Sequence, residues 1–106
     1  KYWPGKHTFV LKKKKIKLYG VKRDSIAVRV PKHKALNDIL KKINKPLVQT
    51  SVNVSGTRPL NNVVDILKEF GDNERVDLIV SGEDLKSPNP SKIIDLSANK
   101  VKILRP

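Results

Sequence analysis

The sequence contains no cysteine and no methionine among its 106 residues, and only 5% of the residues are aromatic. The lack of cysteine excludes disulfides and thiolate metal sites, and it favours an intracellular chain. No apolar run approaches the roughly 20 residues that a membrane-spanning helix requires. No signal peptide is visible, so we expect a cytoplasmic protein without a membrane segment. Because His7 and His33 are far apart and lack neighbouring acidic clusters, we predict no metal site.

Several well-known catalytic motifs are also missing. The sequence has no Walker loop, no dinucleotide-binding fingerprint and no G-x-S-x-G elbow. No pair of carboxylates stands out for acid–base catalysis. The sequence offers instead short polar side chains at the ends of expected strands, together with arginines. This combination is typical of sites that bind and position a charged ligand.

Charge is the strongest compositional feature. The chain has 23 Lys and Arg against 10 Asp and Glu, a net charge of +13. Residues 1–23 contain nine of the basic residues and no acidic one. RNA or a phosphorylated ligand is the natural partner for such a field. The alternative is a solvated lysine-rich hairpin, since only Tyr2, Trp3 and Tyr19 are nearby for stacking on bases.

The hydrophobic pattern predicts an α/β protein of one domain. Expected strands lie at residues 8–11, 16–19, 26–30, 47–51, 76–80, 92–96 and 101–103. Expected helices lie at residues 34–44 and 62–70, and a proline-bracketed loop at residues 85–90. Asn44 suits the end of the first helix, and Asn61 or Asn62 the start of the second. We therefore predict a twisted mixed β-sheet with helices packed on it.

The stretch from Pro46 to Gly56 is the first candidate site. An apolar, β-branched run is followed by Ser51, Asn53 and Gly56, which indicates a buried strand opening into a polar turn. Ligands of open α/β sheets collect at such strand ends. The alternative is an ordinary turn in which these side chains bind the local backbone.

Arginines and hydroxyls elsewhere provide further candidates. Arg29 lies on the strand face opposite the aliphatic residues, where a guanidinium can bind a phosphate or brace a loop through backbone carbonyls. Taken alone, Thr8 fits a strand by its β-propensity and Ser91 fits a turn. Arg105, taken alone, is a solvated charge near the end of the sequence.

Five segments, in the same order, resemble motifs of the YrdC/YciO family. They are Trp3–Thr8 (W-P-G-P-x-T), Ile26–Pro31 (V-A-V-R-x-P), Thr50–Gly56 (T-S-A-N-x-S-G), Pro90–Asp95 (P-S-T-I-V-D) and Ile103–Pro106 (I-L-R-P). The resemblance implies a YrdC-like α/β fold. It also implies that residues 1–106 form the C-terminal portion of the family's domain.

The resemblance implies an activity and a set of site residues. Members of this family are L-threonylcarbamoyladenylate synthases, nucleotidyltransferases that convert ATP, threonine and bicarbonate, with Mg²⁺, into threonylcarbamoyl-AMP and pyrophosphate for tRNA modification. The motifs place Thr8, Ser51, Asn53 and Arg105 around the nucleotide, and Ser51 and Ser91 around threonine. The implied partners are tRNA and the proteins of tRNA threonylcarbamoylation.

The sequence departs from the family pattern in several places. Val52 replaces an alanine, Lys6 and His7 replace Pro-Leu, and Lys92 replaces a threonine. The family's K-x-R motif has no counterpart, so we expect this portion to be inactive alone and prone to form homo-oligomers. One alternative is a double-stranded RNA or tRNA-binding module without catalysis. Another is a carbamoyl-adenylate domain like that of hydrogenase maturation factors.

Overall fold

The computed structural model describes residues 1–15, 18, 21, 23–82 and 89–106. The chain divides into two compact units. The sheet unit consists of residues 1–46 and 90–106, and the middle unit consists of residues 47–89.

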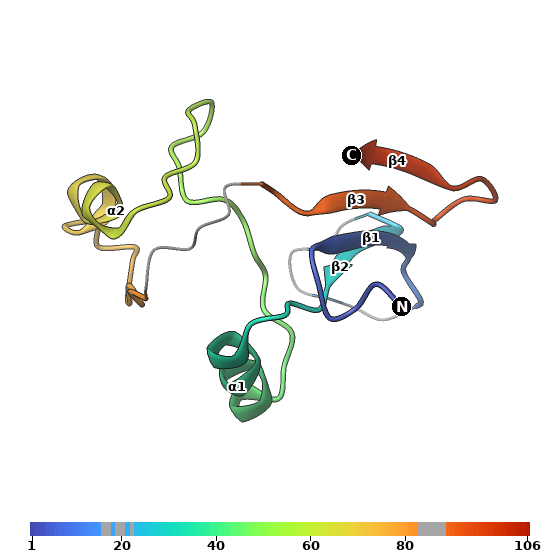
Figure 1. The fold of residues 1–106 in the computed structure, drawn as a ribbon, viewed down its shortest axis with the longest axis horizontal. Coiled ribbons are helices and arrows are strands. Elements are labelled where there is room, and N and C mark those ends of the chain that lie inside the picture. The colour runs from blue at the N-terminus through green and yellow to red at the C-terminus, as the bar shows by residue number, and fades with distance from the viewer. Residues whose placement is uncertain (16–17, 19–20, 22, 83–88) are drawn as a thin grey trace. The chain divides into compact units, whose positions relative to one another are not determined.

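The sheet unit is built on a four-stranded mixed sheet (Figure 1). Its strands are β1 (His7–Lys12), β2 (Ser25–Arg29), β3 (Lys92–Asp95) and β4 (Lys102–Arg105). They lie in the order β2-β1-β3-β4, with β1 parallel to β3 and the other two pairs antiparallel. With the two helices described below, this sheet confirms the predicted α/β class.

The register of the strands gives the sheet two different faces. Paired residues share a face, and successive residues along a strand alternate between faces. A register shift between the pairings of Ile93 and Ile94 interrupts this alternation in β4, so Ile103 and Arg105 lie on opposite faces although they are two positions apart. One row across the sheet consists of Val28, Phe9, Ile94 and Ile103. The adjacent row, on the opposite face, consists of Arg29, Thr8, Ile93 and Arg105. The sheet therefore presents an apolar row on one face and a row with two arginines on the other.

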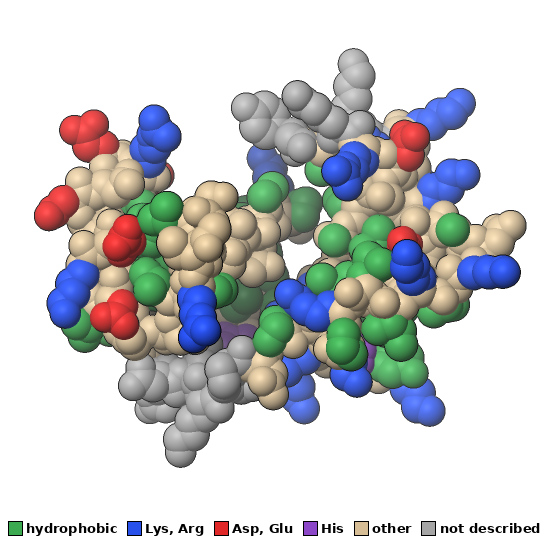
Figure 2. Space-filling model, turned by 90° about the horizontal axis from the view of Figure 1, so that it is seen from above, with side chains coloured by type: hydrophobic (Ala, Val, Ile, Leu, Met, Phe, Trp, Pro, Cys, Tyr) green, Lys and Arg blue, Asp and Glu red, His purple; other side chains and the backbone are tan. Residues whose placement is uncertain are grey.

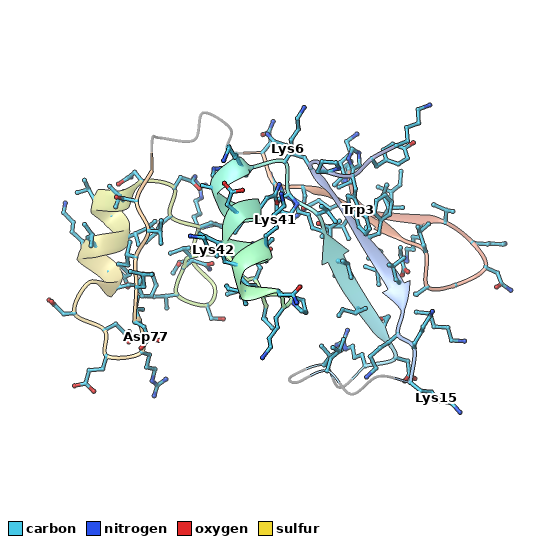
Figure 3. The ribbon with its side chains drawn as sticks, turned by 90° about the horizontal axis from the view of Figure 1, so that it is seen from below. Trp3, Lys6, Lys15, Lys41, Lys42 and Asp77 are labelled. Atoms are coloured by element: carbon cyan, nitrogen blue, oxygen red, sulfur yellow. The ribbon has the colours of Figure 1, made fainter. Side chains whose placement is uncertain are left out.

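Helix α1 (Lys34–Ile43) follows β2 in the sheet unit. His33 caps its first turn, and Asn44 ends it in the left-handed conformation with φ 51°. Asparagine tolerates this conformation well, so the structure confirms the predicted end of the helix. Lys41 and Lys42 lie in the last turn, where the helix dipole favours positive charge (Figure 3).

Helix α2 (Val63–Phe70) lies in the middle unit. The Asn62 side chain accepts a hydrogen bond from the backbone N–H of Asp65 at 2.8 Å. Gly71 follows the last helical residue and its N–H donates to the Leu67 carbonyl. Both ends agree with the sequence prediction, in which Asn61 or Asn62 was the starting residue.

Two predicted strands are wrong. Neither residues 47–51 nor residues 76–80 form a strand, although both runs are apolar and β-branched. Their side chains are open to solvent, with Val48 91%, Leu78 77% and Val80 72% exposed. A strand needs a hydrogen-bonded neighbour, and no described segment pairs with either run. The predictions for residues 16–19 and 85–90 lie largely outside the described residues.

Burial is slight throughout the described residues. None of their apolar side chains is buried, and Ser91, at 8% exposure, is their one buried polar residue. Hydrophobic side chains are accordingly visible at the surface among the lysines and arginines (Figure 2). None of the described helices combines the length and the hydrophobicity needed to cross a membrane.

Candidate functional site: the Thr8–Ser91–Arg105 cluster

Three predicted site residues meet on one face of the sheet unit. The hydroxyl oxygens of Thr8 and Ser91 lie 2.8 Å apart, within hydrogen-bonding distance. Arg105 donates from Nε to the Ser91 carbonyl at 2.8 Å and from Nη2 to the Ser91 hydroxyl at 3.3 Å. The structure thus joins residues from three separate motifs in one hydrogen-bonded cluster.

The sheet topology explains why these residues converge. Ser91 comes directly before β3, and the N–H of Lys92 donates to the Lys6 carbonyl at 3.0 Å. This parallel pairing brings Ser91 beside Thr8, although 83 positions separate them in the sequence. The antiparallel pairing of β3 with β4 then places Arg105 opposite Ile93. Each side chain is therefore positioned by a strand and not by a loop alone.

Arg105 retains most of its capacity to donate hydrogen bonds. A guanidinium has five N–H donors, and the two contacts with Ser91 use two of them. Among the described residues the single ion pair joins Lys34 and Asp38, so no described carboxylate neutralises Arg105. An unneutralised guanidinium with free donors is suited to bidentate binding of a phosphate or a carboxylate.

Ser91 links the other two members of the cluster. Its side chain is almost fully buried, and both its carbonyl and its hydroxyl are hydrogen-bonded. A serine hydroxyl offers one donor and two acceptor positions, so it can bond Thr8 and Arg105 at once. Ser91 therefore holds Thr8 and Arg105 at a fixed separation, as a site for a small anion requires.

Arg29 holds the turn that precedes β1. Its Nε donates to the Gly5 carbonyl at 3.1 Å, and the N–H of Gly5 donates to the Val30 carbonyl at 2.9 Å. This contact is the loop brace that was one of the two roles predicted for Arg29. Since Arg29 pairs with Thr8 across the sheet, its unused donors lie on the same face as the cluster. A direct contact between Arg29 and a ligand stays a prediction.

Trp3 also holds the turn that precedes β1, a role that was not predicted from the sequence. Its indole N–H donates to the His7 carbonyl at 2.8 Å, and its ring meets that of Phe9 edge-on, with the ring centroids 5.1 Å apart. Edge-to-face contacts of this kind are favourable for aromatic pairs. The adjoining Pro4-Gly5 pair signals a turn in the sequence, but it does not indicate what the Trp3 ring contacts.

Ser51 and Asn53 belong to the middle unit. Asn53 donates its side-chain amide to the carbonyls of Val54 and Thr57, at 2.9 and 3.0 Å. Gly56, with φ 88°, completes this turn in a conformation that other residues rarely adopt. Asn53 thus has the local turn role that was the alternative for this stretch, and Ser51 is exposed. Contacts of these two residues with a ligand stay predictions.

Asp95 stabilises the hairpin that carries Arg105. Its carboxylate accepts hydrogen bonds from the hydroxyl and the backbone N–H of Ser97, at 2.6 and 2.8 Å. These two bonds, the hydroxyl first, lower the pKa of Asp95 below its ordinary value, and the nearby charge of Lys102 lowers it further. The ionised carboxylate thus favours the turn between β3 and β4.

Comparison with known proteins extends this description. The sequence matches the Sua5/YciO/YrdC family, described as "Telomere recombination", over residues 1–106. It is 33% identical over 102 residues to a protein named threonylcarbamoyl-AMP synthase from Idiomarina loihiensis. That alignment covers 94% of this chain and 54% of the relative, so the chain spans about half the relative's length. On this evidence, the chain belongs to the Sua5/YciO/YrdC family.

Proposed function

We propose that this chain contributes the nucleotide-binding part of a threonylcarbamoyl-AMP synthase. The observation that carries the proposal is the Thr8–Ser91–Arg105 cluster, in which a guanidinium without a carboxylate partner lies beside two hydroxyls. A relative that is 33% identical bears the name of that activity. The implied substrates are ATP, L-threonine and bicarbonate, and the product serves the modification of tRNA.

The reaction depends on orientation and on stabilisation of charge. The amine of threonine attacks the carbon of bicarbonate and water leaves; an oxygen of the resulting carbamate attacks the α-phosphorus of ATP and pyrophosphate leaves. No covalent bond to the protein forms, so holding the reactants in line provides much of the catalysis. Arg105 stabilises the negative charge that develops on the phosphate, as preorganised donors do in such sites.

Each cluster residue has a part in this proposal. Thr8 and Arg105 bind the nucleotide, Arg105 through the N–H groups that Ser91 leaves unused. Ser91 positions Arg105 and presents its hydroxyl to threonine. The family motifs assign Ser51 and Asn53 of the middle unit as further nucleotide contacts, and Ser51 also as a contact of threonine.

Mg²⁺ enters the proposal only as part of the ATP complex. In the described part of the chain, no three His, Asp or Glu side chains are close enough together to bind a metal ion. The described residues therefore do not fit a protein-held Mg²⁺ site. On ATP, Mg²⁺ neutralises phosphate charge and is coordinated largely by phosphate oxygens and water.

Calorimetric titration with ATP and Mg²⁺, in the presence of threonine and bicarbonate, tests the proposal. We expect saturable binding that Arg105→Ala weakens by at least about tenfold, or about 1.4 kcal/mol. Arg75→Ala is the matched control, because it removes the same charge from an exposed position in the middle unit. Equal losses in the two variants, or no binding by a folded sample, would contradict the proposed site.

A second candidate function is the binding of double-stranded RNA or tRNA without catalysis. The observation that favours it is the concentration of positive charge in residues 1–23, which hold nine Lys and Arg and no acidic residue. Lys15 lies beyond the C-terminal end of β1, at one end of the sheet (Figure 3). RNA affinity that falls steeply with salt and needs neither ATP nor threonine would favour this function.

A further inference from the structure

Three consecutive carbonyls of the turn before β1 accept hydrogen bonds from three different segments. In chain order, the pairs are Gly5 with Arg29 Nε at 3.1 Å, Lys6 with the Lys92 N–H at 3.0 Å, and His7 with the Trp3 indole N–H at 2.8 Å. The first donor belongs to β2, the second to β3 and the third to the segment before the turn. The turn therefore cannot shift without breaking at least one of these bonds, and Thr8 follows it directly.

Of the three bonds, the one from Trp3 lies closest to Thr8 along the chain. The His7 carbonyl and the Thr8 N–H belong to the same peptide group, which is planar. The indole that binds this carbonyl therefore also fixes the direction of the Thr8 N–H and the position of the Thr8 Cα. Arg29 acts at Gly5, three positions before Thr8, so its influence on Thr8 is less direct.

The side chain of Thr8 carries this orientation into the cluster. Threonine is branched at Cβ, which restricts rotation about χ1. The direction of the Thr8 hydroxyl is thus set largely by the backbone, and this hydroxyl lies 2.8 Å from that of Ser91. A tilt of the His7–Thr8 peptide would move the two hydroxyls apart.

Trp3 is itself held against the sheet. Its ring meets that of Phe9 at an interplanar angle of 76°, and Phe9 lies in β1, which has β2 and β3 on its two sides. The segment that carries Trp3 also lies directly against the turn, because a Cβ added at Gly5 would be 2.8 Å from the Tyr2 carbonyl oxygen. The indole therefore has a fixed base from which to hold the turn.

We propose that Trp3 is a positioning residue of the nucleotide site. Through the His7–Thr8 peptide, its indole N–H holds the Thr8 hydroxyl in the Thr8–Ser91–Arg105 cluster, and Trp3 does not itself touch the ligand. The identity of the ligand rests on the proposed function, whereas the positioning rests on the hydrogen bonds of the turn. The two can therefore fail separately.

The first test needs no ligand. Three-bond NMR couplings at Thr8 show whether its χ1 occupies one rotamer. We expect one rotamer in the parent chain and averaging over rotamers in Trp3→Phe, which keeps an aromatic ring and removes the N–H donor. The matched control is Tyr2→Phe, which removes a polar donor from the neighbouring ring, 4.9 Å from that of His7, and should keep the single rotamer. A single rotamer in Trp3→Phe, or averaging in both variants, would overturn the proposal.

The second test is a double-mutant cycle in the binding of ATP and Mg²⁺. Trp3→Phe should weaken binding about threefold to tenfold in the parent chain. It should have no further effect in Thr8→Val, which has no hydroxyl to position, and Tyr2→Phe should leave binding unchanged in both backgrounds. Amide exchange along the β1–β3 pairing shows that each variant has kept its sheet.

Equal weakening by Trp3→Phe with and without the Thr8 hydroxyl would overturn the proposal, because Trp3 would then act on the fold as a whole. If the parent chain binds no ATP, the proposed function fails. The Thr8 couplings then decide by themselves whether Trp3 positions Thr8.

Discussion

The sheet unit and the middle unit contain similar sequences with different outcomes. Residues 92–95 (KIID) and residues 76–80 (VDLIV) are both short, and each contains at least two β-branched residues. The first forms β3, with β1 on one side and β4 on the other. The second forms no strand, and Leu78 and Val80 within it are 77% and 72% exposed.

The difference lies in the neighbours and not in the residues themselves. β-propensity describes how well a side chain fits a paired, half-covered surface, and it gives little stability to an isolated extended segment. β3 has partners on both edges, whereas residues 76–80 have none among the described residues. An apolar, β-branched pattern therefore indicates that a segment can form a strand. Whether the strand forms depends on a neighbouring strand with which it can pair.

Proline substitution should produce the largest contrast between the two regions. Ile94→Pro removes an N–H from a strand with neighbours on both sides and should cost at least about 3 kcal/mol. Leu78→Pro, in the unpaired run, should change stability by no more than about 0.5 kcal/mol. Hydrogen exchange of the β1 amides measures both effects. Similar losses in the two variants would show that residues 76–80 are paired after all.

Removal of the Ser91 hydroxyl should have the next largest effect. Ser91→Ala deletes the hydroxyl contacts with Thr8 and with Nη2 of Arg105 at a buried position and keeps the bond from Arg105 Nε to the carbonyl, so it should cost about 1–3 kcal/mol in denaturant unfolding. The matched control is Ser55→Ala, at an exposed position in the middle unit, which should be nearly neutral. Equal changes in the free energy of unfolding for Ser91→Ala and Ser55→Ala would show that the cluster does not stabilise the sheet.

The Arg29 brace should contribute less, because its hydrogen bond is exposed. Arg29→Ala removes the bond to the Gly5 carbonyl and should cost up to about 1 kcal/mol in denaturant unfolding. Arg29→Lys keeps the charge without the planar donor fork and should be intermediate. Arg58→Ala in the middle unit is the control. Equal stability of the Arg29→Ala and Arg58→Ala variants would show that the bond between Arg29 and the Gly5 carbonyl does not stabilise the fold.

The smallest effect should be a pH dependence from Asp95. Its pKa in the folded chain is below the ordinary value of 3.8, so the folded state favours the ionised form. The resulting stability is fully present above the unfolded value and is lost as the pH falls through the folded pKa. Ser97→Ala should raise the pKa of Asp95 and so reduce the loss of stability at low pH. NMR titration of the carboxyl group in both proteins measures it, and equal pKa values would contradict the assignment to Ser97.

Local sequence signals predicted the parts of the fold that depend on local chemistry. The end of the first helix at Asn44 and the start of the second at Asn61 or Asn62 were predicted, because a capping side chain acts on its own backbone. The strand register could not be predicted, since it is set by contacts between distant segments. The contact of Thr8 with Ser91 spans 83 positions and follows from the β1–β3 pairing alone.

The residues of the candidate site could be predicted only in part, because the site is also formed by contacts between distant segments. Taken singly, Thr8, Ser91 and Arg105 had ordinary structural roles, and only the family motifs grouped them. The structure brings these three together. Asn53, the most prominent residue of the first candidate stretch, bonds its own turn instead, because a short amide readily satisfies nearby carbonyls. The part played by Trp3 could be recognised only once Phe9 was placed beside it.

The most direct test of the account is an NMR titration of the chain with ATP and Mg²⁺. If these residues bind the nucleotide, ATP should cause saturable shifts of the Thr8 and Ser91 amides and of the Arg105 Nε–H, and leave the exposed Arg75 Nε–H unchanged. Shifts confined to residues 12–15, or uniform changes at every arginine, would show non-specific binding to positive charge. That result would show that Thr8, Ser91 and Arg105 do not form an anion site.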